Sequence, residues 1–167
     1  MPPAIAASTT VIFEIAFALA MVASAAADIA WRRLPNWLNA AIAIAYLPWA
    51  WAAGESWSLI GVGFMVGAVV LAIGFGLFAA NVIGGGDAKF AAAVAVWIGF
   101  SYDLLRFFLI MSLAGGVLAI LALIWQAVTR RPLRRPLPYG VAIAAAGLDH
   151  WLHQTQSGAL VAGHLGL

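Results

Sequence analysis

The sequence predicts an all-α fold, namely a polytopic membrane helix bundle of about six transmembrane helices that forms a single domain over residues 1–167. Three observations predict this class. Apolar residues make up 65% of the chain, and charged residues only 8%, whereas a soluble domain carries about a quarter. The mean hydropathy is +1.03. The apolar segments are also continuous, without the alternating polarity of a membrane β-barrel.

Six apolar segments are separated by polar or helix-breaking residues, and each is interpreted as a span. The first is 20 residues long, which suffices to cross a bilayer. The fourth has only 15 residues, so we expect it to begin at the membrane edge, where the preceding glycine loop dips in among protein or water. The predicted spans are 8–27, 37–53, 57–83, 88–102, 104–128 and 137–153, and a tail follows over 154–167.

Several side chains refine this interpretation of the spans. Pro35 suits the first turn of the second helix. Trp37, Trp49 and Trp51 have the spacing of interfacial anchors near the two ends of that span. The pattern Gly63-x-x-x-Gly67 in the third span is typical of close helix packing.

The distribution of basic residues predicts the topology. With alternating spans, seven of the eight Lys and Arg residues fall on the side reached after spans one, three and five, and only Arg106 falls on the other. The positive-inside rule therefore places both termini outside the cytoplasm, and it puts Asp28 and Asp87 at the cytoplasmic edge. The seven are Arg32, Arg33, Lys89, Arg130, Arg131, Arg134 and Arg135.

Composition also excludes several classes of function. The chain has no Cys, which excludes disulfides and thiol catalysis, and a net charge of +2 does not favour nucleic-acid binding. Residues 1–10 lack the basic start of a signal peptide. Asp149, His150, His153 and His164 offer weak metal ligands, which we interpret as a solvated end. We expect no cofactor and no metal.

Asp28 and Asp87 are the two acids that the topology brings to one depth. Two neighbouring carboxylates share a proton because both cannot ionise easily. One can then activate a water while the protonated partner donates to a carbonyl, as in aspartic proteases. The glycines of Gly84-Gly85-Gly86-Asp87 allow positive φ angles and the close approach of an unwound peptide. The predicted reaction is peptide hydrolysis.

These residues carry a resemblance to a known family. Gly84-Gly85-Gly86-Asp87-Ala88-Lys89 is similar to the G-x-G-D-x-K signature of prepilin peptidases, and Asp28 ahead of Arg33-Leu34-Pro35-Asn36 looks like their first motif. Leu137-Pro138-Tyr139-Gly140-Val141-Ala142 resembles the start of their last span. The similarity extends from about Ala26 to Ala146, and the short form that serves Flp, or tight-adherence, pili is the nearest group.

The resemblance implies roles for individual residues. Asp28 and Asp87 would be the catalytic pair, Gly84 and Gly86 would shape the active-site loop, and Lys89 and Asn36 would support it. The substrate would be a prepilin with a basic cytoplasmic leader and an apolar helix in the bacterial inner membrane. Longer members methylate the product and carry an insertion with paired Cys; this chain lacks that insertion, so methyl transfer is not predicted.

Structural alternatives stand beside each of these roles. Asp28 could pair with Arg32 one helical turn later, Asp87 could cap a helix, and Lys89 could be a snorkelling anchor. Glu14, inside the first span, is expected to be neutral or paired with a polar group. The alternative function is a small proton- or cation-coupled transporter component that uses the same two acids.

Overall fold

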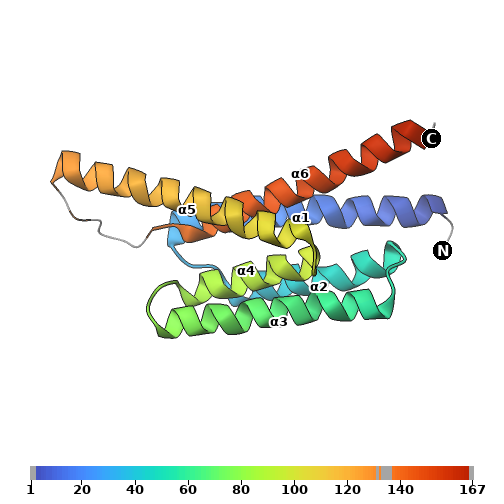
Figure 1. Cartoon of the computed structure of the whole chain (residues 1–167), viewed down its shortest axis with the longest axis horizontal. Coiled ribbons are helices and arrows are strands. Elements are labelled where there is room, and N and C mark those ends of the chain that lie inside the picture. The colour runs from blue at the N-terminus through green and yellow to red at the C-terminus, as the bar shows by residue number, and fades with distance from the viewer. Residues whose placement is uncertain (1–2, 131, 133–136, 166–167) are drawn as a thin grey trace.

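The computed structural model of the chain describes residues 3–130, 132 and 137–165, with side chains between Ser8 and Gln156 in those ranges. This part of the chain contains helices and no strands (Figure 1), so the all-α prediction is confirmed. The helices are α1 (Pro3–Trp31), α2 (Asn36–Ala52), α3 (Trp57–Ala79), α4 (Gly85–Ile98), α5 (Tyr102–Thr129) and α6 (Tyr139–Leu165).

The short helix α4 forms the centre of the bundle. It packs against α2, α3, α5 and α6, and every residue from Phe90 to Ile98 is buried. Its 14 residues give a length of about 21 Å at 1.5 Å per residue. The helix ends earlier than the predicted fourth span because Gly99 adopts a positive φ of 63°. Its position inside a ring of longer helices explains how so short a segment is accommodated.

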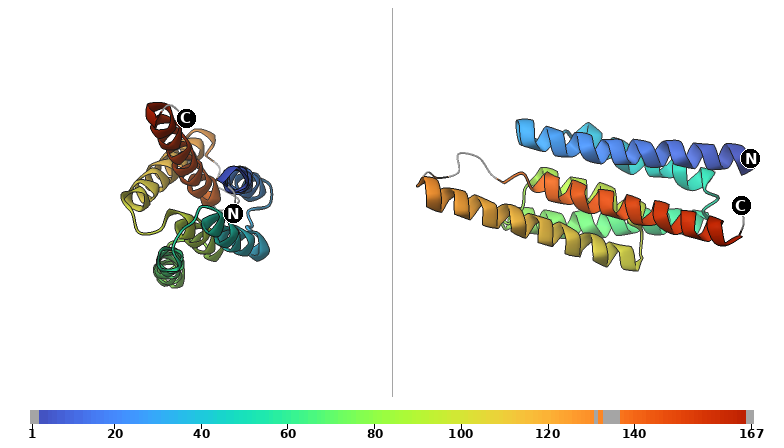
Figure 2. Two further views of the ribbon diagram at one scale, coloured as in Figure 1. Left: turned by 90° about the vertical axis from the view of Figure 1, so that its right-hand side faces the viewer. Right: turned by 90° about the horizontal axis from the view of Figure 1, so that it is seen from above.

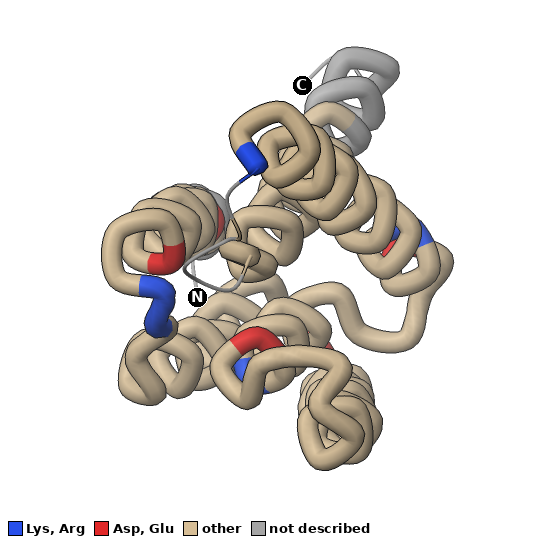
Figure 3. Tube along the Cα trace, turned by 90° about the vertical axis from the view of Figure 1, so that its left-hand side faces the viewer, with Lys and Arg blue, Asp and Glu red and all other residues tan. Residues whose placement is uncertain are grey.

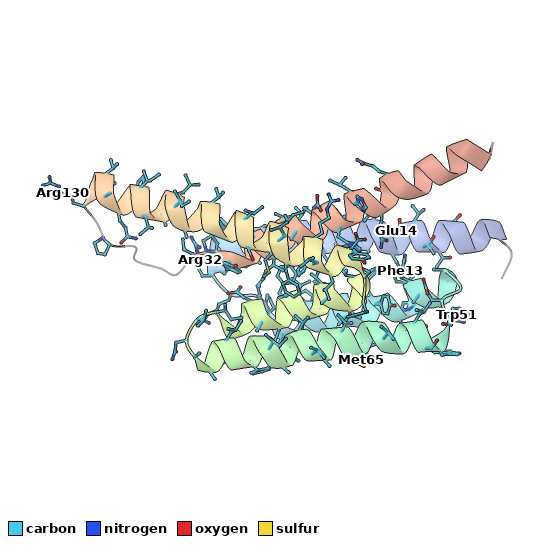
Figure 4. All side chains as sticks on the ribbon, in the orientation of Figure 1. Phe13, Glu14, Arg32, Trp51, Met65 and Arg130 are labelled. Carbon is cyan, nitrogen blue, oxygen red and sulfur yellow. The ribbon has the colours of Figure 1, made fainter. Side chains whose placement is uncertain are left out.

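The connections between helices alternate between the two ends of the bundle. α1 and α5 end, and α4 begins, at the end where Arg32 and Arg130 lie (Figures 1 and 4). The first residues of α1 and the last of α6 lie at the opposite end. The structure therefore has the alternation on which the topology prediction depends. Arg131, Arg134 and Arg135, which that prediction also counted, lie outside the described residues.

The outer surface of the bundle is apolar. Among the described residues, Ser8–Trp31, Trp57–Ala79 and Tyr102–Thr129 are long and apolar enough to cross a membrane. Much of α5 faces outward, and Leu113 and Leu123 are 62% and 65% exposed. A helix that is apolar on all sides and poorly covered by protein is typical of a membrane span. These three helices support the assignment of the chain to the membrane-protein class.

Several predicted boundaries were wrong, and among them α3 ends at Ala79 and not at residue 83. α1 continues through Asp28 to Trp31, because no helix breaker interrupts it before Arg32 takes a positive φ of 53°. Pro35 is the N-cap of α2 and not a residue of its first turn. The predicted tail after 153 belongs to α6, which continues to Leu165.

Glycines explain how closely α3 packs on α4. A Cβ atom on Gly63 would lie 2.8 Å from the carbonyl oxygen of Val96, and one on Gly74 would lie 2.8 Å from the Cβ of Ala88. A Cβ on Gly67 would meet the Val96 side chain. Because hydrogen is the only side chain that fits at these points, the predicted packing role of Gly63 and Gly67 is confirmed.

An aromatic cluster that contains Phe17, Trp49 and Trp97 joins α1, α2 and α4. Trp37 and Trp51 are 70% and 67% exposed, as expected of anchors. Trp49 was predicted to be a third anchor, but its ring packs 5.5 Å from that of Trp97. Its Nε1 donates to Glu14 Oε1 at 3.3 Å. The expectation that Glu14 pairs with a polar group in the bundle is thus confirmed, and the anchor role of Trp49 was wrong.

Candidate active site

Asp28 lies in the last turns of α1 and faces the start of α6. Only 6% of the residue is exposed. The backbone N–H groups of Gly140 and Val141 are directed at its carboxylate, and the Val141 N–H also donates to the carbonyl oxygen of Pro138 at 3.1 Å. Oδ2 makes no hydrogen bond of ordinary geometry to the described residues. The charge of Arg32 also acts on this carboxylate, but the close contacts of the Asp28 side chain are with α6.

Asp87 occupies the first turn of α4, and Gly84 is the N-cap of that helix. The N–H of Gly84 donates to the Asp87 carboxylate, so the acid reaches back to the cap residue as in a capping box. The capping role that was considered for Asp87 is therefore present. It leaves the second oxygen of the carboxylate open to other partners, because a single N–H occupies only part of its accepting capacity.

The two acids belong to one site. The charge of Asp28 acts on Asp87, although 59 residues separate them in the sequence. Asp28 lies in the last turns of α1 and Asp87 in the first turn of α4, and Figure 3 views the molecule from the side on which Arg130 lies, with acidic and basic residues on several segments. The structure brings together the pair that the topology predicted, and two carboxylates so arranged disfavour simultaneous ionisation.

The glycines beside Asp87 act through space and not through unusual φ angles. Gly84 has a φ of −73°, and neither Gly85 nor Gly86 is among the residues with positive φ, so the predicted use of positive φ was wrong. A Cβ on Gly84 would lie 2.7 Å from Asp87 Oδ2. Gly86 faces Leu34, whose Cβ would be 3.7 Å from an added Cβ. Gly84 thus makes room for the carboxylate, and Gly86 contacts the α1–α2 connection.

A hydrogen bond ties the α1–α2 connection to α4. Lys89 Nζ donates to Asn36 Oδ1 at 2.9 Å. Lys89 follows Asp87 by two residues, and Asn36 is the first residue of α2. Together with the contact between Leu34 and Gly86, this bond fixes the segment after Asp28 against the segment that carries Asp87. The two supporting residues that the sequence suggested are therefore partners of each other.

Sequence reasoning did not identify Gly140 as a part of this site. A Cβ on Gly140 would lie 2.8 Å from Asp28 Oδ2 and 3.0 Å from its Cγ. The neighbouring Tyr139 packs its ring against Gly115 of α5. The only sequence signal was that residues 137–142 resemble the start of the family's last span, which gave them no role in the site.

The histidines of α6 form a separate cluster with α5 at the far end. His150 Nδ1 lies 3.6 Å from Asp103 Oδ2, and Arg106 donates twice to Asp149, at 2.8 and 2.9 Å. His150 is 6% exposed, so the expectation of a solvated end was wrong for this residue. The side chain of His164 lies outside the described residues. No cluster of metal-ligating side chains occurs in the described part of the chain.

Comparison with known proteins agrees with this arrangement. The model of the type IV leader peptidase family matches residues 15–120, a range that contains Asp28, the glycine run and Asp87. Neither a search of curated proteins nor a search of solved structures found a match. Because the family model covers well over half of the chain, the protein belongs to the type IV leader peptidase family.

Proposed function

We propose that the chain is a membrane aspartic endopeptidase that removes the cytoplasmic leader from type IV or Flp prepilin-like proteins. The observation that carries the proposal is that Asp28 and Asp87, on separate helices, share one site in a chain of this family. Six transmembrane crossings with both termini outside would place that site at the cytoplasmic face of the bacterial inner membrane.

The surroundings of the two acids support a division of labour between them. Both acids lie at a helix N-terminus, but Asp28 receives two backbone N–H groups, from Gly140 and Val141, whereas Asp87 receives one, from Gly84, and each such contact stabilises the charged form. Asp28 is therefore the carboxylate that activates the water. Asp87 carries the shared proton and donates it to the substrate carbonyl, which polarises the peptide bond for attack. No metal or cofactor enters this scheme.

The test is cleavage of a tagged prepilin in membranes from cells that lack other leader peptidases. Asp28→Asn and Asp87→Asn should each abolish cleavage, because an amide can neither accept the water proton nor share one. Asp103→Asn is the matched control, since Asp103 lies in the first turn of α5 beside the histidine cluster; this variant should cleave normally. Leader removal that persists in either of the first two variants would refute the proposal.

A further inference from the structure

A groove runs along the bundle between α3 and α5, and Asp87 lies at one end of it. The groove encloses about 590 Å³. It exists because α3 packs along α4 while α5 packs along α6, and α3 and α5 occupy separate corners when the bundle is viewed end on (Figure 2). α4 lies between them and forms the floor. A peptide segment that lies along this groove would therefore have one of its ends beside Asp87.

The lining of the groove suits an apolar helix. Its polar side chains, among the described residues, are Asp87, Ser112 and Tyr139, and the others are apolar. The floor includes Ala88 and Ala91, small residues of the kind that let a second helix approach closely within a membrane. Methionines also line the walls, and their flexible side chains adapt to different partners.

The dimensions of the groove fit a transmembrane segment. Its α3 wall extends from Met65 to Leu77, and Figure 4 shows Met65 on α3, well away from the end where Arg32 lies. Twelve residue steps along a helix correspond to about 18 Å, more than half of the roughly 30 Å hydrocarbon thickness of a bilayer. A helix of about the same number of residues would lie alongside α3 over this distance.

We infer that the groove holds the apolar transmembrane segment of the leader-bearing substrate, with the bond to be cut at the Asp87 end; this inference rests on the proposed function. A membrane lipid is the competing occupant. A lipid chain in the groove would bring its phosphate towards the two acids, which share one proton and so keep one negative charge between them, and like charges at short range repel. A peptide segment has no such charge at its entry point, and it presents the group on which the two acids act.

Cross-linking tests the inference directly, because the chain has no native Cys. Met111→Cys places a single thiol in the groove, and Asp87→Asn in the same chain keeps the substrate uncut. A series of prepilins carries one Cys at successive positions of the apolar segment. Mild oxidation should cross-link Met111→Cys to positions that recur about every 3.6 residues, as expected of one helix face.

Leu113→Cys is the matched control. Leu113 also belongs to α5, is 62% exposed and does not line the groove. It should give few cross-links, without a helical period. Equal cross-linking at the two positions, or none at Met111→Cys while the substrate co-purifies uncut, would overturn the inference and leave lipid as the occupant. Cleavage that continues in the Asp87→Asn chain would instead defeat the proposed function.

A second measurement replaces a small side chain in the groove by a large one. Val69 lines the groove on α3, so Val69→Trp should slow cleavage about tenfold by excluding the substrate segment. Leu113→Trp, at an exposed position of α5 outside the groove, should leave cleavage unchanged. Both variants are compared at equal amounts of monodisperse protein in detergent. If wild type cleaves and Val69→Trp cleaves as fast as Leu113→Trp, the groove is not where the substrate binds.

Discussion

Gly140 lies directly against Asp28: a Cβ atom at residue 140 would be 2.8 Å from the carboxylate Oδ2. Carbon and oxygen atoms do not approach so closely without a bond, so any larger side chain would displace the acid or the start of α6. The same contact brings the N–H groups of Gly140 and Val141 towards Asp28. Gly140 is therefore a positioning residue for one of the two acids.

Gly140→Ala should lower prepilin cleavage about tenfold or more, because displacement of a reacting group by a fraction of an ångström weakens alignment for attack. The readout is the rate of leader removal at equal enzyme concentration. Gly116→Ala is the control, since a Cβ there meets nothing within 4 Å; its rate should equal that of wild type. Wild-type activity in Gly140→Ala would show that the carboxylate tolerates the change.

The contrast between Asp87 and Gly140 shows what the sequence could and could not predict. Asp87 was predictable because an acid beside three glycines in an apolar chain is unusual and costly. Counting spans and basic residues then placed Asp28 at the same end. Gly140 could not be found in this way. A glycine near a helix start has many ordinary explanations, and its contact with Asp28 depends on how α6 packs against α1.

The ends of the helices could likewise be predicted only in part from the sequence. The second and third helices began within one residue of their predicted starts because Pro35 and the polar turn before Trp57 are strong local signals. α1 passed its predicted end, since polar residues alone do not stop a helix. Trp49 was assigned to the membrane interface by its residue type, but its partners Glu14 and Trp97 come from other helices. Tertiary packing decided these cases.

Lys89 and Asn36 should act as a pair. Lys89→Met and Asn36→Leu each remove the bond between Lys89 Nζ and Asn36 Oδ1. The bond is exposed, so each change should reduce the free energy of unfolding by about 0.5–1 kcal/mol. The rate of leader cleavage should fall by more than this loss of stability accounts for, because the bond fixes the segments that carry the two acids. Both are measured, by thermal unfolding in detergent and by leader removal.

The double variant Lys89→Met/Asn36→Leu tests whether the two residues are coupled. If they act through their mutual bond, the double variant should be no worse than either single one, since the interaction is lost only once. Additive losses would mean that each residue has its own partner. Lys89 would then be an anchor in the membrane interface, as the alternative interpretation held.

Gly67 should tolerate no larger side chain. A Cβ there would meet the Val96 side chain and lie 3.2 Å from the carbonyl oxygen of Ala92, so Gly67→Ala should push α3 away from α4 and cost about 1–3 kcal/mol. Gly61→Ala, on the same helix, meets nothing within 4 Å and should be neutral or slightly stabilising. The measurement is thermal unfolding in detergent; equal midpoints for the two variants would contradict this account of the helix contact.

Trp97 should contribute to stability through a buried hydrogen bond in addition to its ring contacts. Its Nε1 donates to the carbonyl oxygen of Ile42 at 2.7 Å, which joins α2 to the end of α4 opposite to Asp87. Trp97→Phe keeps an aromatic ring but removes the donor and leaves a cavity, so it should cost about 2–4 kcal/mol. Trp57→Phe is the control, because Trp57 is 76% exposed and its loss should change the unfolding midpoint little.

Since α4 carries Asp87 at its first turn, a loosened Trp97 contact should also lower leader cleavage. A Trp97→Phe chain that is destabilised and yet cleaves at the wild-type rate would show that the α2–α4 contact supports the fold without positioning Asp87.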